Sequence, residues 1–176
     1  MAEHRIKVEE LKEKAPMLHA GDRVLLSGTV YTARDAAHKR ITALLDAGEE
    51  LPFPLAGACI YYAGPTPAEP GAVIGSCGPT TSGRMDRFAP RLLDLGLAAM
   101  IGKGQRNADV VSAIKRNGAV YLCAVGGAGA LAAQSVQKCE EIAFKDLGCE
   151  SIKRMTVLDF PLIVAIDSEG NDLFKR

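Results

Sequence analysis

Three basic side chains stand where predicted strands pass into predicted helices. Arg34 lies in TARDAAHKR, Arg84 in GPTTSGRMD and Lys103 in IGKGQRN. In open α/β sheets, ligands bind beyond the carboxyl ends of the strands, where loops converge and helix N-termini present free N–H groups to anions. A cation early in a helix opposes the helix dipole unless an anion binds nearby. The pattern predicts a small-anion site, although any one cation could instead pair with a local acid such as Asp35 or Asp86.

The segment GPTTSGRMD carries the densest set of candidate groups. Its Gly-Pro turn is followed by three hydroxyls, Thr80, Thr81 and Ser82, and by Gly83, which lets the backbone approach a ligand closely. One hydroxyl is enough to cap a helix, so three exceed what capping needs. The guanidinium of Arg84 beside them is suited to clamp a carboxylate or a phosphate through two hydrogen bonds.

His38 follows Arg34 by one helical turn, so the two side chains share a helix face. An imidazole near neutral pH can act as a general acid or base. We interpret His38 as a residue that supports Arg34 rather than as a catalytic one. Asp35 and Thr81, adjacent to Arg34 and Thr80, are placed in the same supporting group.

The segment VGGAGALA resembles a nucleotide-binding fingerprint. From Gly127 it matches G-x-G-x-x-A, and Asp146 lies nearly 20 residues beyond. Such a match is weakly specific in a chain rich in Gly and Ala, and its place in the last third leaves too few βαβ units for a nucleotide fold. We therefore interpret it as a site of close helix-to-sheet packing.

The five cysteines do not form a metal-binding pattern. They are widely scattered, with no C-x-x-C pair and no His at ligand spacing. Cys59, Cys77 and Cys123 lie in runs of apolar or small residues, which is typical of buried structural thiols. We expect no metal ligands in this chain.

The order of apolar and polar segments predicts an α/β chain. RVLLSGTVYTA is a β-rich apolar run, and helical periodicity begins at Arg34 in ARDAAHKRITALLDAGEE. The runs ACIYYAG and AVIGSCG predict two strands separated by the proline-containing loop PTPAEPG. GPTTSGRMDRFAPRLLDLG then predicts a second passage into a helix.

The second half of the chain repeats this scheme and then changes. LAAMIGK before GQRNADVVSAIKRNG, and AVYLCAV before GGAGALAAQSVQK, each predict a strand followed by a helix. The tail predicts further strands in EIAFKDLG, SIKRMTVLDF and PLIVAIDSEGNDLF, with a turn at 168–171. Because these strands lack intervening helices, we expect a mixed sheet with flanking helices. Nothing divides the chain, so residues 1–176 are predicted to form a single domain.

Composition excludes several classes of function. Of the 176 residues, 48% are hydrophobic and 24% charged, and the formal net charge is zero, so the chain lacks the basic field that nucleic acids attract. No apolar run approaches the roughly 20 residues that cross a bilayer. The charged N-terminus is unlike a signal peptide, so we expect a cytoplasmic protein with no membrane or nucleic-acid partner.

A set of segments resembles a known family in order and spacing. They are LLSGTVYTARDAAHKRI, IYYAGP, GPTTSGRMD, MIGKGQRN, YLCAVGGAGALAAQSV and VLDFPLIVAIDSEGND. Together they resemble the C-terminal domain, or β subunit, of class I fumarases and the related L(+)-tartrate dehydratases. The resemblance extends from Val24 to Asp172, nearly the whole chain.

The resemblance implies a swivelling β/β/α domain that closes over a second domain or α subunit. That partner would hold a [4Fe-4S] cluster on three cysteines, so the cofactor belongs to the partner and not to this chain. A hetero-oligomer built on a dimer is implied as well. The reaction would be the reversible dehydration of malate to fumarate, catalysed by a hydro-lyase.

The resemblance also implies roles for individual residues. Thr80 resembles the threonine proposed as the proton-abstracting base, and Arg34, Arg84 and Lys103 resemble the cations that hold the dicarboxylate. Two carboxylates and the charge that develops during the reaction require more than one cation. A hydroxyl with its ordinary high pKa is a poor base, so the role of Thr80 requires local activation.

Other functions remain open at this stage. ARDAAHKRI, GPTTSGRMD and AVGGAGALAAQSV are closer to fumarases, whereas small subunits of tartrate dehydratase tend to have CRD-type and KGGMG-like sequences in place of ARD and KGQRN. A regulatory or assembly module and a stand-alone small-anion-binding domain are further alternatives. The intact set of cations and Thr80 argues against a module that has lost its catalytic function.

Overall fold

The computed structural model describes residues 1–124 and 129–175. The strands of this part are β1 (Glu3–Lys7), β2 (Arg23–Thr32), β3 (Cys59–Tyr61), β4 (Ala99–Gly102), β5 (Val120–Cys123), β6 (Val136–Ala143) and β7 (Ile152–Ile166). The α-helices are α1 (Leu11–Lys14), α2 (Asp35–Asp46), α3 (Ala89–Asp94), α4 (Ala108–Asn117) and α5 (Gly129–Gln134). Short 3-10 helices are η1 (Val8–Glu10), η2 (Ala15–Met17), η3 (Ser82–Met85), η4 (Lys145–Glu150) and η5 (Leu173–Lys175).

The strands form one mixed sheet, as predicted for an α/β chain with flanking helices. Strands β1 to β5 are parallel to one another, whereas β7 runs antiparallel to β2, β5 and β6. Because β7 pairs with β2 along one edge and with β5 along the other, the strands β2, β3, β4, β5 and β7 close into a ring. The mixed character therefore arises from one long strand near the end of the chain.

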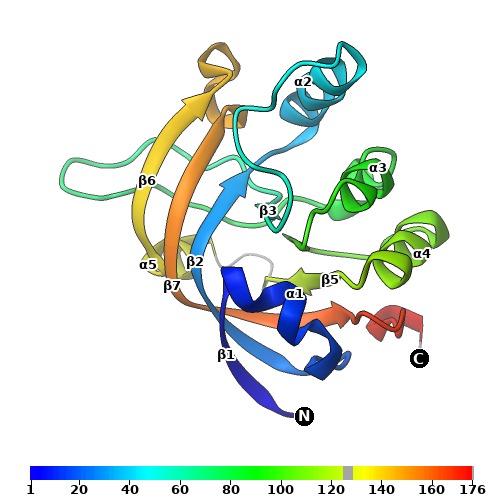
Figure 1. The fold of residues 1–176 in the computed structure, drawn as a ribbon. Helices are drawn as coiled ribbons and strands as arrows, with labels where there is room; N and C mark the ends of the chain where they lie inside the picture. Colours follow the sequence, from blue (N-terminus) through cyan, green and yellow to red (C-terminus); the bar gives the residue numbers. More distant parts are fainter. Residues whose placement is uncertain (125–128, 176) are drawn as a thin grey trace.

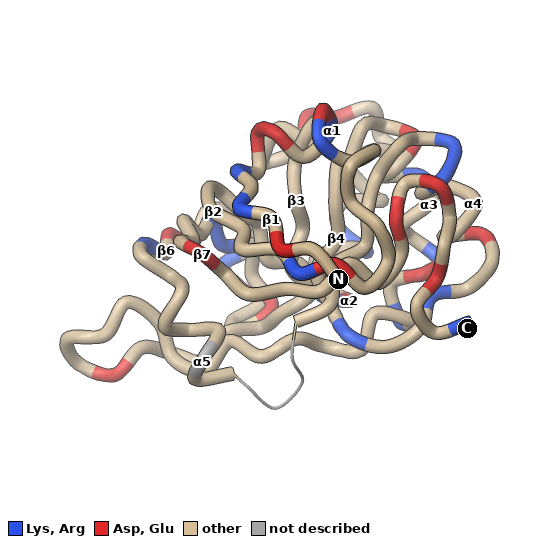
Figure 2. The backbone as a smooth tube through the Cα atoms, turned by 90° about the horizontal axis from the view of Figure 1, so that it is seen from below, with Lys and Arg blue, Asp and Glu red and all other residues tan. Residues whose placement is uncertain are grey.

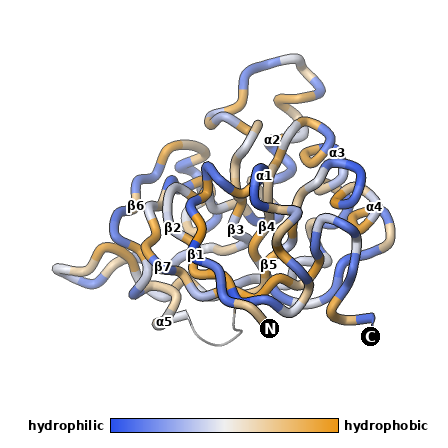
Figure 3. Tube along the Cα trace, turned by 60° about the horizontal axis from the view of Figure 1, so that its bottom comes forward, coloured by the Kyte–Doolittle hydropathy of each residue, from blue (hydrophilic) through white to orange (hydrophobic). Residues whose placement is uncertain are grey.

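Two hydrophobic clusters lie on opposite faces of β3, β4 and β5. Successive side chains of a strand point to opposite faces, so Tyr61 joins the cluster shared with β2 and β7 while Ile60 joins the cluster beneath the helices. The helices α2, α3 and α4 cover that second face, and β2, β6 and β7 lie on the other side (Figure 1). The layers are thus sheet, sheet and helix. The central strands consist mostly of hydrophobic residues (Figure 3), and they contribute to the clusters on both faces.

The first residues are more ordered than the charged lead that the sequence suggested. β1 pairs in parallel with β2, and Ile6 and Leu11 are buried in the cluster shared by β2 and β7. Ile6 and Val8 are buried, while Arg5 and Lys7 between and beside them are exposed. Basic and acidic positions are interspersed around the fold, in keeping with the zero net charge (Figure 2).

One predicted strand is wrong, and another is right only at its start. AVIGSCG is a loop, and residues 66–73 before and within it are all exposed. This segment forms no ladder; instead Thr66 donates its amide N–H to the carbonyl of Ser76 at 3.0 Å and closes the base of a projecting loop. EIAFKDLG is a strand only in its first three residues, which end β6 (Val136–Ala143), whereas residues 145–150 form η4.

The tail strands SIKRMTVLDF and PLIVAIDSEGNDLF are a single strand, β7, which continues through Pro161. Pairing with β6 ends at Val157 and pairing with β5 begins at Ile163, so Pro161 lies where only β2 is a neighbour. The missing N–H of proline therefore removes no second ladder bond. The predicted turn at 168–171 is present, closed by the Gly170 amide, which donates to the carbonyl of Asp167 at 3.0 Å.

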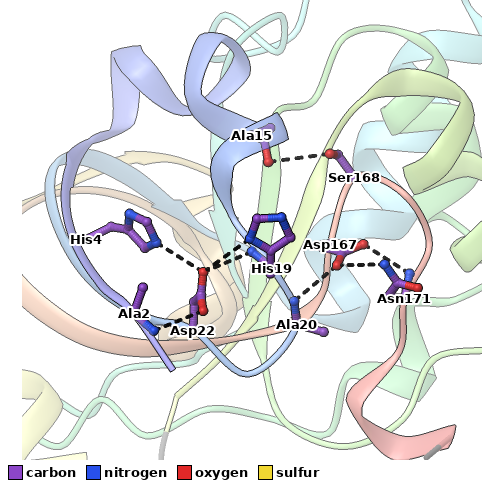
Figure 4. Close-up of polar contacts among 9 residues, drawn as sticks. All are labelled: Ala2, His4, Ala15, His19, Ala20, Asp22, Asp167, Ser168 and Asn171. Carbon is purple, nitrogen blue, oxygen red and sulfur yellow. Dashed lines mark hydrogen bonds and ion pairs between the residues drawn. The ribbon is translucent and has the colours of Figure 1, made fainter.

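Two buried aspartates hold the end of the molecule where β2 begins and β7 ends (Figure 4). Asp22 accepts hydrogen bonds from the amides of Ala2 and His19 and lies 3.0 Å from Nε2 of His4. Asp167 accepts from the amide of Ala20 at 3.1 Å. Within the described ranges, no helix has the length and apolarity needed to span a bilayer.

Replacing Asp22 by Asn should weaken the fold in a pH-dependent way. Burial alone would raise the pKa of Asp22, but the bonds from His19, His4 and Ala2 outweigh it and hold the pKa below its ordinary value of 3.8. The carboxylate therefore contributes stability above its unfolded-state pKa and loses that contribution as the pH falls through the lower folded-state pKa. We expect D22N to lose roughly 1–2 kcal/mol of unfolding free energy at neutral pH, with the difference vanishing in acid.

Urea unfolding of D22N and the parent chain across this pH range measures the effect. Asp46→Asn, which removes an exposed carboxylate paired with Arg91, is the matched control and should change little. An equal loss for D22N at all pH values would contradict the assignment.

Candidate active site

The predicted site residues lie on loops at one edge of the sheet. Strands β2, β3 and β4 are parallel, so their carboxyl ends meet at this edge. Arg34 follows β2, Lys103 follows β4, and the Thr80 amide donates at 2.7 Å to the carbonyl of Tyr62, which directly follows β3. The structure therefore brings the three candidate loops to one end of the molecule.

Arg34 occupies the N-cap position of α2 with an extended backbone. Its carbonyl accepts from the His38 amide at 2.9 Å and lies 2.8 Å from Nδ1 of the same residue. Because a carbonyl only accepts, Nδ1 carries the proton and Nε2 is the bare nitrogen. Nε2 is buried with no partner among the described residues, and burial, the main cause, lowers the pKa of His38 to about 4. His38 is thus neutral at pH 7 and fixes the main chain of Arg34.

The side chain of Arg34 passes over the backbone of Gly64. A Cβ at position 64 would lie 2.8 Å from Nη1 of Arg34 and 3.2 Å from the carbonyl oxygen of Cys149, so only glycine leaves room there. Nε of Arg34 is buried and has no hydrogen-bond partner in the part of the chain that the structure describes. An unpaired buried donor on a cation is a group that an anion would satisfy.

Arg84, on η3, pairs with Asp35 in the first turn of α2. Nη2 of Arg84 lies 3.0 Å from Oδ1 of Asp35, with the two side chains 48% and 36% exposed. The local-acid interpretation is therefore right for Asp35, which joins the loop after β3 to the start of α2. An exposed pair of this kind contributes roughly 0–1 kcal/mol, so the guanidinium can exchange its partner readily.

The three hydroxyls do not act as the expected helix cap. Thr81 is the N-cap residue of η3 but makes no capping hydrogen bond, and Ser82 is buried with its Oγ 2.7 Å from the hydroxyl of Tyr121. The side chain of Thr80 is half-buried and makes no hydrogen bond to any described residue. Capping therefore accounts for none of these side chains, and the described residues give Thr80 no partner that would activate it.

Lys103 is exposed, and its main chain touches the loop of Thr80. A parallel bridge joins residues 81 and 103, and the Ser82 amide donates to the Lys103 carbonyl at 2.9 Å. No acid of the described ranges lies within ion-pair distance of Lys103. The ammonium group is thus available at the same edge as Arg34 and Arg84.

Sequence reasoning missed the most buried ion pair of this region. Arg106 is 3% exposed, and its Nε donates to Oδ1 of Asp86 at 2.6 Å. The sequence suggests Asp86 only as a local acid for one of the three predicted cations, and it indicates no role for Arg106. The sequence signal that could have pointed to Arg106 is Asn107. Its side chain caps α4 by accepting from the Val110 amide at 3.0 Å. Because a helix cap has a defined position, the preceding residue, Arg106, is held in a defined position as well.

The nucleotide-type fingerprint falls only partly on residues that the structure describes. Gly127 lies outside the described residues, and Asp146 is paired with Arg40 of α2. At the start of α5, a Cβ on Gly129 would overlap Oγ of Ser76 and lie 3.1 Å from the Gly78 amide nitrogen. Gly129 therefore packs closely against the loop that leads to Thr80.

The cysteines do not form a group that could hold an iron–sulfur cluster. Cys59 and Cys77 are buried, as expected, and burial raises the pKa of the Cys77 thiol to about 12. Cys123 is only half-buried, and Cys149 is exposed. Among the described residues, no three His, Cys, Asp or Glu side chains are placed to bind a metal ion. The described residues of this chain therefore do not fit the cluster.

The family of this chain follows from its similarity to known sequences. The sequence model of the family described as Fumarase C-terminus matches residues 2–176. The chain belongs to this family. It is 39% identical over 171 residues to "Fumarate hydratase class I, anaerobic" of Escherichia coli, covering 96% of this chain but 31% of that protein. It is 40% identical to "Putative L(+)-tartrate dehydratase subunit beta" of Methanocaldococcus jannaschii, covering 94% of this chain and 88% of that subunit.

The chain therefore spans about a third of the length of the fumarate hydratases that it matches. A further example is "Fumarate hydratase 2" of Leishmania major, which is 37% identical and of which 30% is covered. The family resemblance inferred from the sequence is confirmed over nearly the whole chain. The roles of Thr80, Arg34, Arg84 and Lys103 within this fumarase C-terminal fold stay predictions.

Substituting Gly102 by Ala should destabilise this fumarase-type domain. Gly102 ends β4, where a Cβ would overlap Oγ of Ser82 and lie 2.9 Å from Cδ2 of Tyr62. Overpacking of this kind costs about 1–3 kcal/mol. We expect a lower thermal midpoint for G102A by calorimetry. Gly83→Ala is the control, since its Cβ would meet only the Gln105 carbonyl, at 3.8 Å. An unchanged midpoint for G102A would show that the contact between β4 and Ser82 is loose.

Proposed function

We propose that this chain is the small subunit of a hydro-lyase that reversibly dehydrates (S)-malate to fumarate. The observation that carries the proposal is the convergence of Arg34, Arg84, Lys103 and Thr80 at the carboxyl edge of the sheet. Nε of Arg34 lacks a partner among the described residues, and Lys103 has no ion pair there. Such a cluster suits a dicarboxylate, whose charges need separate cations.

Each residue has a distinct task in this proposal. The guanidinium groups of Arg34 and Arg84 bind carboxylate oxygens, and Lys103 adds a point charge that stabilises negative charge as it develops. Thr80, as its alkoxide, takes the proton from the carbon next to the carbon that loses hydroxide, and its own hydroxyl proton passes beforehand to a base outside the described residues. His38 supports this arrangement by holding the Arg34 carbonyl, and Asp35 holds Arg84 when no substrate is bound.

The rest of the site belongs to a partner in this proposal. The fumarate hydratases that the chain matches are about three times as long, and two other relatives are named as β subunits. We infer that an α subunit supplies the [4Fe-4S] cluster and joins this chain in a hetero-oligomer built on a dimer. The swivelling of this domain over its partner, and a cytoplasmic location, are further parts of the proposal.

Tartrate is the second candidate substrate. Coverage favours it, because the chain spans 88% and 84% of two tartrate dehydratase β subunits. The segments ARD and KGQRN favour fumarase instead. Anaerobic co-expression with the α subunit, cluster reconstitution and assay with malate and with L(+)-tartrate discriminate between them. Activity on neither would leave a binding or assembly module as the remaining interpretation.

The isolated chain should fold and be inactive. It has the cations and the hydroxyl but no group of described residues that could hold a metal ion. Circular dichroism should show a cooperative unfolding transition, and assays with malate should show no turnover. Turnover by the chain alone, free of any partner, would refute the division of the site between subunits.

Arg84→Ala in the assembled enzyme should lower kcat/KM strongly. Loss of one partner from a charged, desolvated pair costs about 2–5 kcal/mol, because the substrate carboxylate is left without its counter-charge. Steady-state kinetics with malate measures the loss. Arg91→Ala is the matched control, since Arg91 of α3 forms a similarly exposed pair with Asp46, the last residue of α2. Near-normal rate constants for R84A would remove Arg84 from the site.

A further inference from the structure

A buried network joins the loop of Thr80 and Arg84 to the loop of Lys103. We call it the Asp86–Arg106 lock, and it consists of Asp86, Arg106, Tyr62 and Tyr121. Asp86 ends the first loop two residues after Arg84, and Arg106 ends the second three residues after Lys103. The side chain of Arg106 is fully buried, and that of Asp86 is 11% exposed.

The carboxylate of Asp86 binds the second loop twice. Oδ1 accepts from Nε of Arg106 at 2.6 Å, and Oδ2 accepts from the Asn107 amide at 2.8 Å. One contact involves a side chain and the other the main chain. Both the position and the orientation of residues 106 and 107 are therefore fixed relative to the end of the first loop.

Two tyrosines complete the lock from the sheet side. The guanidinium of Arg106 lies 5.2 Å and 4.8 Å from the ring centroids of Tyr62 and Tyr121, and Nη2 donates to the Tyr62 hydroxyl at 3.2 Å. The Tyr121 hydroxyl lies 2.7 Å from Oγ of Ser82 and 2.8 Å from the carbonyl of Gly104. Tyr121 thus contacts both loops at once.

Stability alone is a weak reason for such an arrangement. A buried ion pair costs desolvation, and well-packed apolar residues of the same volume often stabilise a fold equally well. What the ion pair adds is a defined geometry between the two loops. A displacement of about 1 Å between catalytic groups can lower a rate about 100-fold, so this geometry matters for the site.

We propose that Arg106 is a positioning residue that holds Thr80 and Arg84 in register with Lys103. The inference rests on the proposed function for its kinetic consequences, but the register itself is a property of this chain. Arg106 acts only through the two loops and makes no contact with substrate.

Arg106→Lys in the assembled enzyme is the first test. Lysine keeps the charge but cannot reach Asp86 and the Tyr62 hydroxyl together, so kcat should fall and KM rise, with kcat/KM reduced about 10- to 100-fold per folded molecule. Arg116→Lys is the matched control, because Arg116 makes two hydrogen bonds to Asp94 away from the loops. Leu162→Ala controls for lost stability, being buried in the other cluster. Both controls should keep their kcat/KM at temperatures where they are folded.

Amide hydrogen exchange on the isolated chain measures how firmly the two loops are held together, and the measurement does not require enzyme activity. In R106K the amides of Ser82 and Asn107, which bond across the two loops, should exchange at least 10-fold faster than in the parent chain. The Ala98 amide, bonded to the Ala58 carbonyl at 2.9 Å, should be unaffected. The control R116K should leave all three amides unchanged.

The outcomes separate the two proposals. If R106K does not fold, Asp86→Asn, which keeps the shape and removes the charge, is measured in its place with the same expectations. Parent-like kcat/KM and parent-like exchange in the variant that folds would overturn the positioning role. If the parent complex has no hydro-lyase activity, the proposed function fails, while the exchange of Ser82 and Asn107 still decides whether Arg106 sets the register.

Discussion

The pairing of β7 with β2 and β5 is the constraint on which the rest of the molecule depends. Along one edge β7 follows β2 from Arg23 to Tyr31, and along the other it reaches β5 near Leu122. Because the ring of strands is closed, the carboxyl ends of β2, β3 and β4 cannot shift independently. Loops that begin on such rigid elements carry their side chains with little positional freedom. The candidate site is thus held in place by a strand that contributes none of its residues.

Glycine residues allow the loops on this rigid frame to contact one another closely. Gly64 admits the Arg34 side chain, Gly102 admits Ser82, and Gly129 admits the turn at Ser76. A side chain at any of these points would separate segments that now touch. The high content of Gly and the low content of aromatic residues in this chain are therefore linked to the site and not only to the core.

Local signals explain which parts of the fold could be predicted. The helices α2 and α4 could be predicted because α2 has helical periodicity and α4 follows an apolar, strand-like run. Non-local facts explain the failures. AVIGSCG has strand-like composition but no neighbouring strand to pair with, and β7 crosses Pro161 only because one of its edges is free there. Arg106 could not be recognised as buried, since its environment is built by Tyr62, Tyr121 and Asp86, which are distant in sequence. The positions of Arg34 and Lys103 at strand ends followed from the order of elements alone.

The exposed pair between Arg84 and Asp35 affects how the proposed site binds a carboxylate. Asp35 lies in the first turn of α2, where the helix dipole favours a negative charge even after its partner leaves. In the proposed function, a substrate carboxylate replaces the carboxylate of Asp35 on Arg84, and the displaced aspartate keeps a favourable environment. Asp35 thereby keeps the guanidinium of Arg84 in one orientation before a ligand binds, and it lowers the affinity for that ligand only slightly. In the proposed function, the carboxylate of Asp35 thus occupies the position on Arg84 that a substrate carboxylate takes.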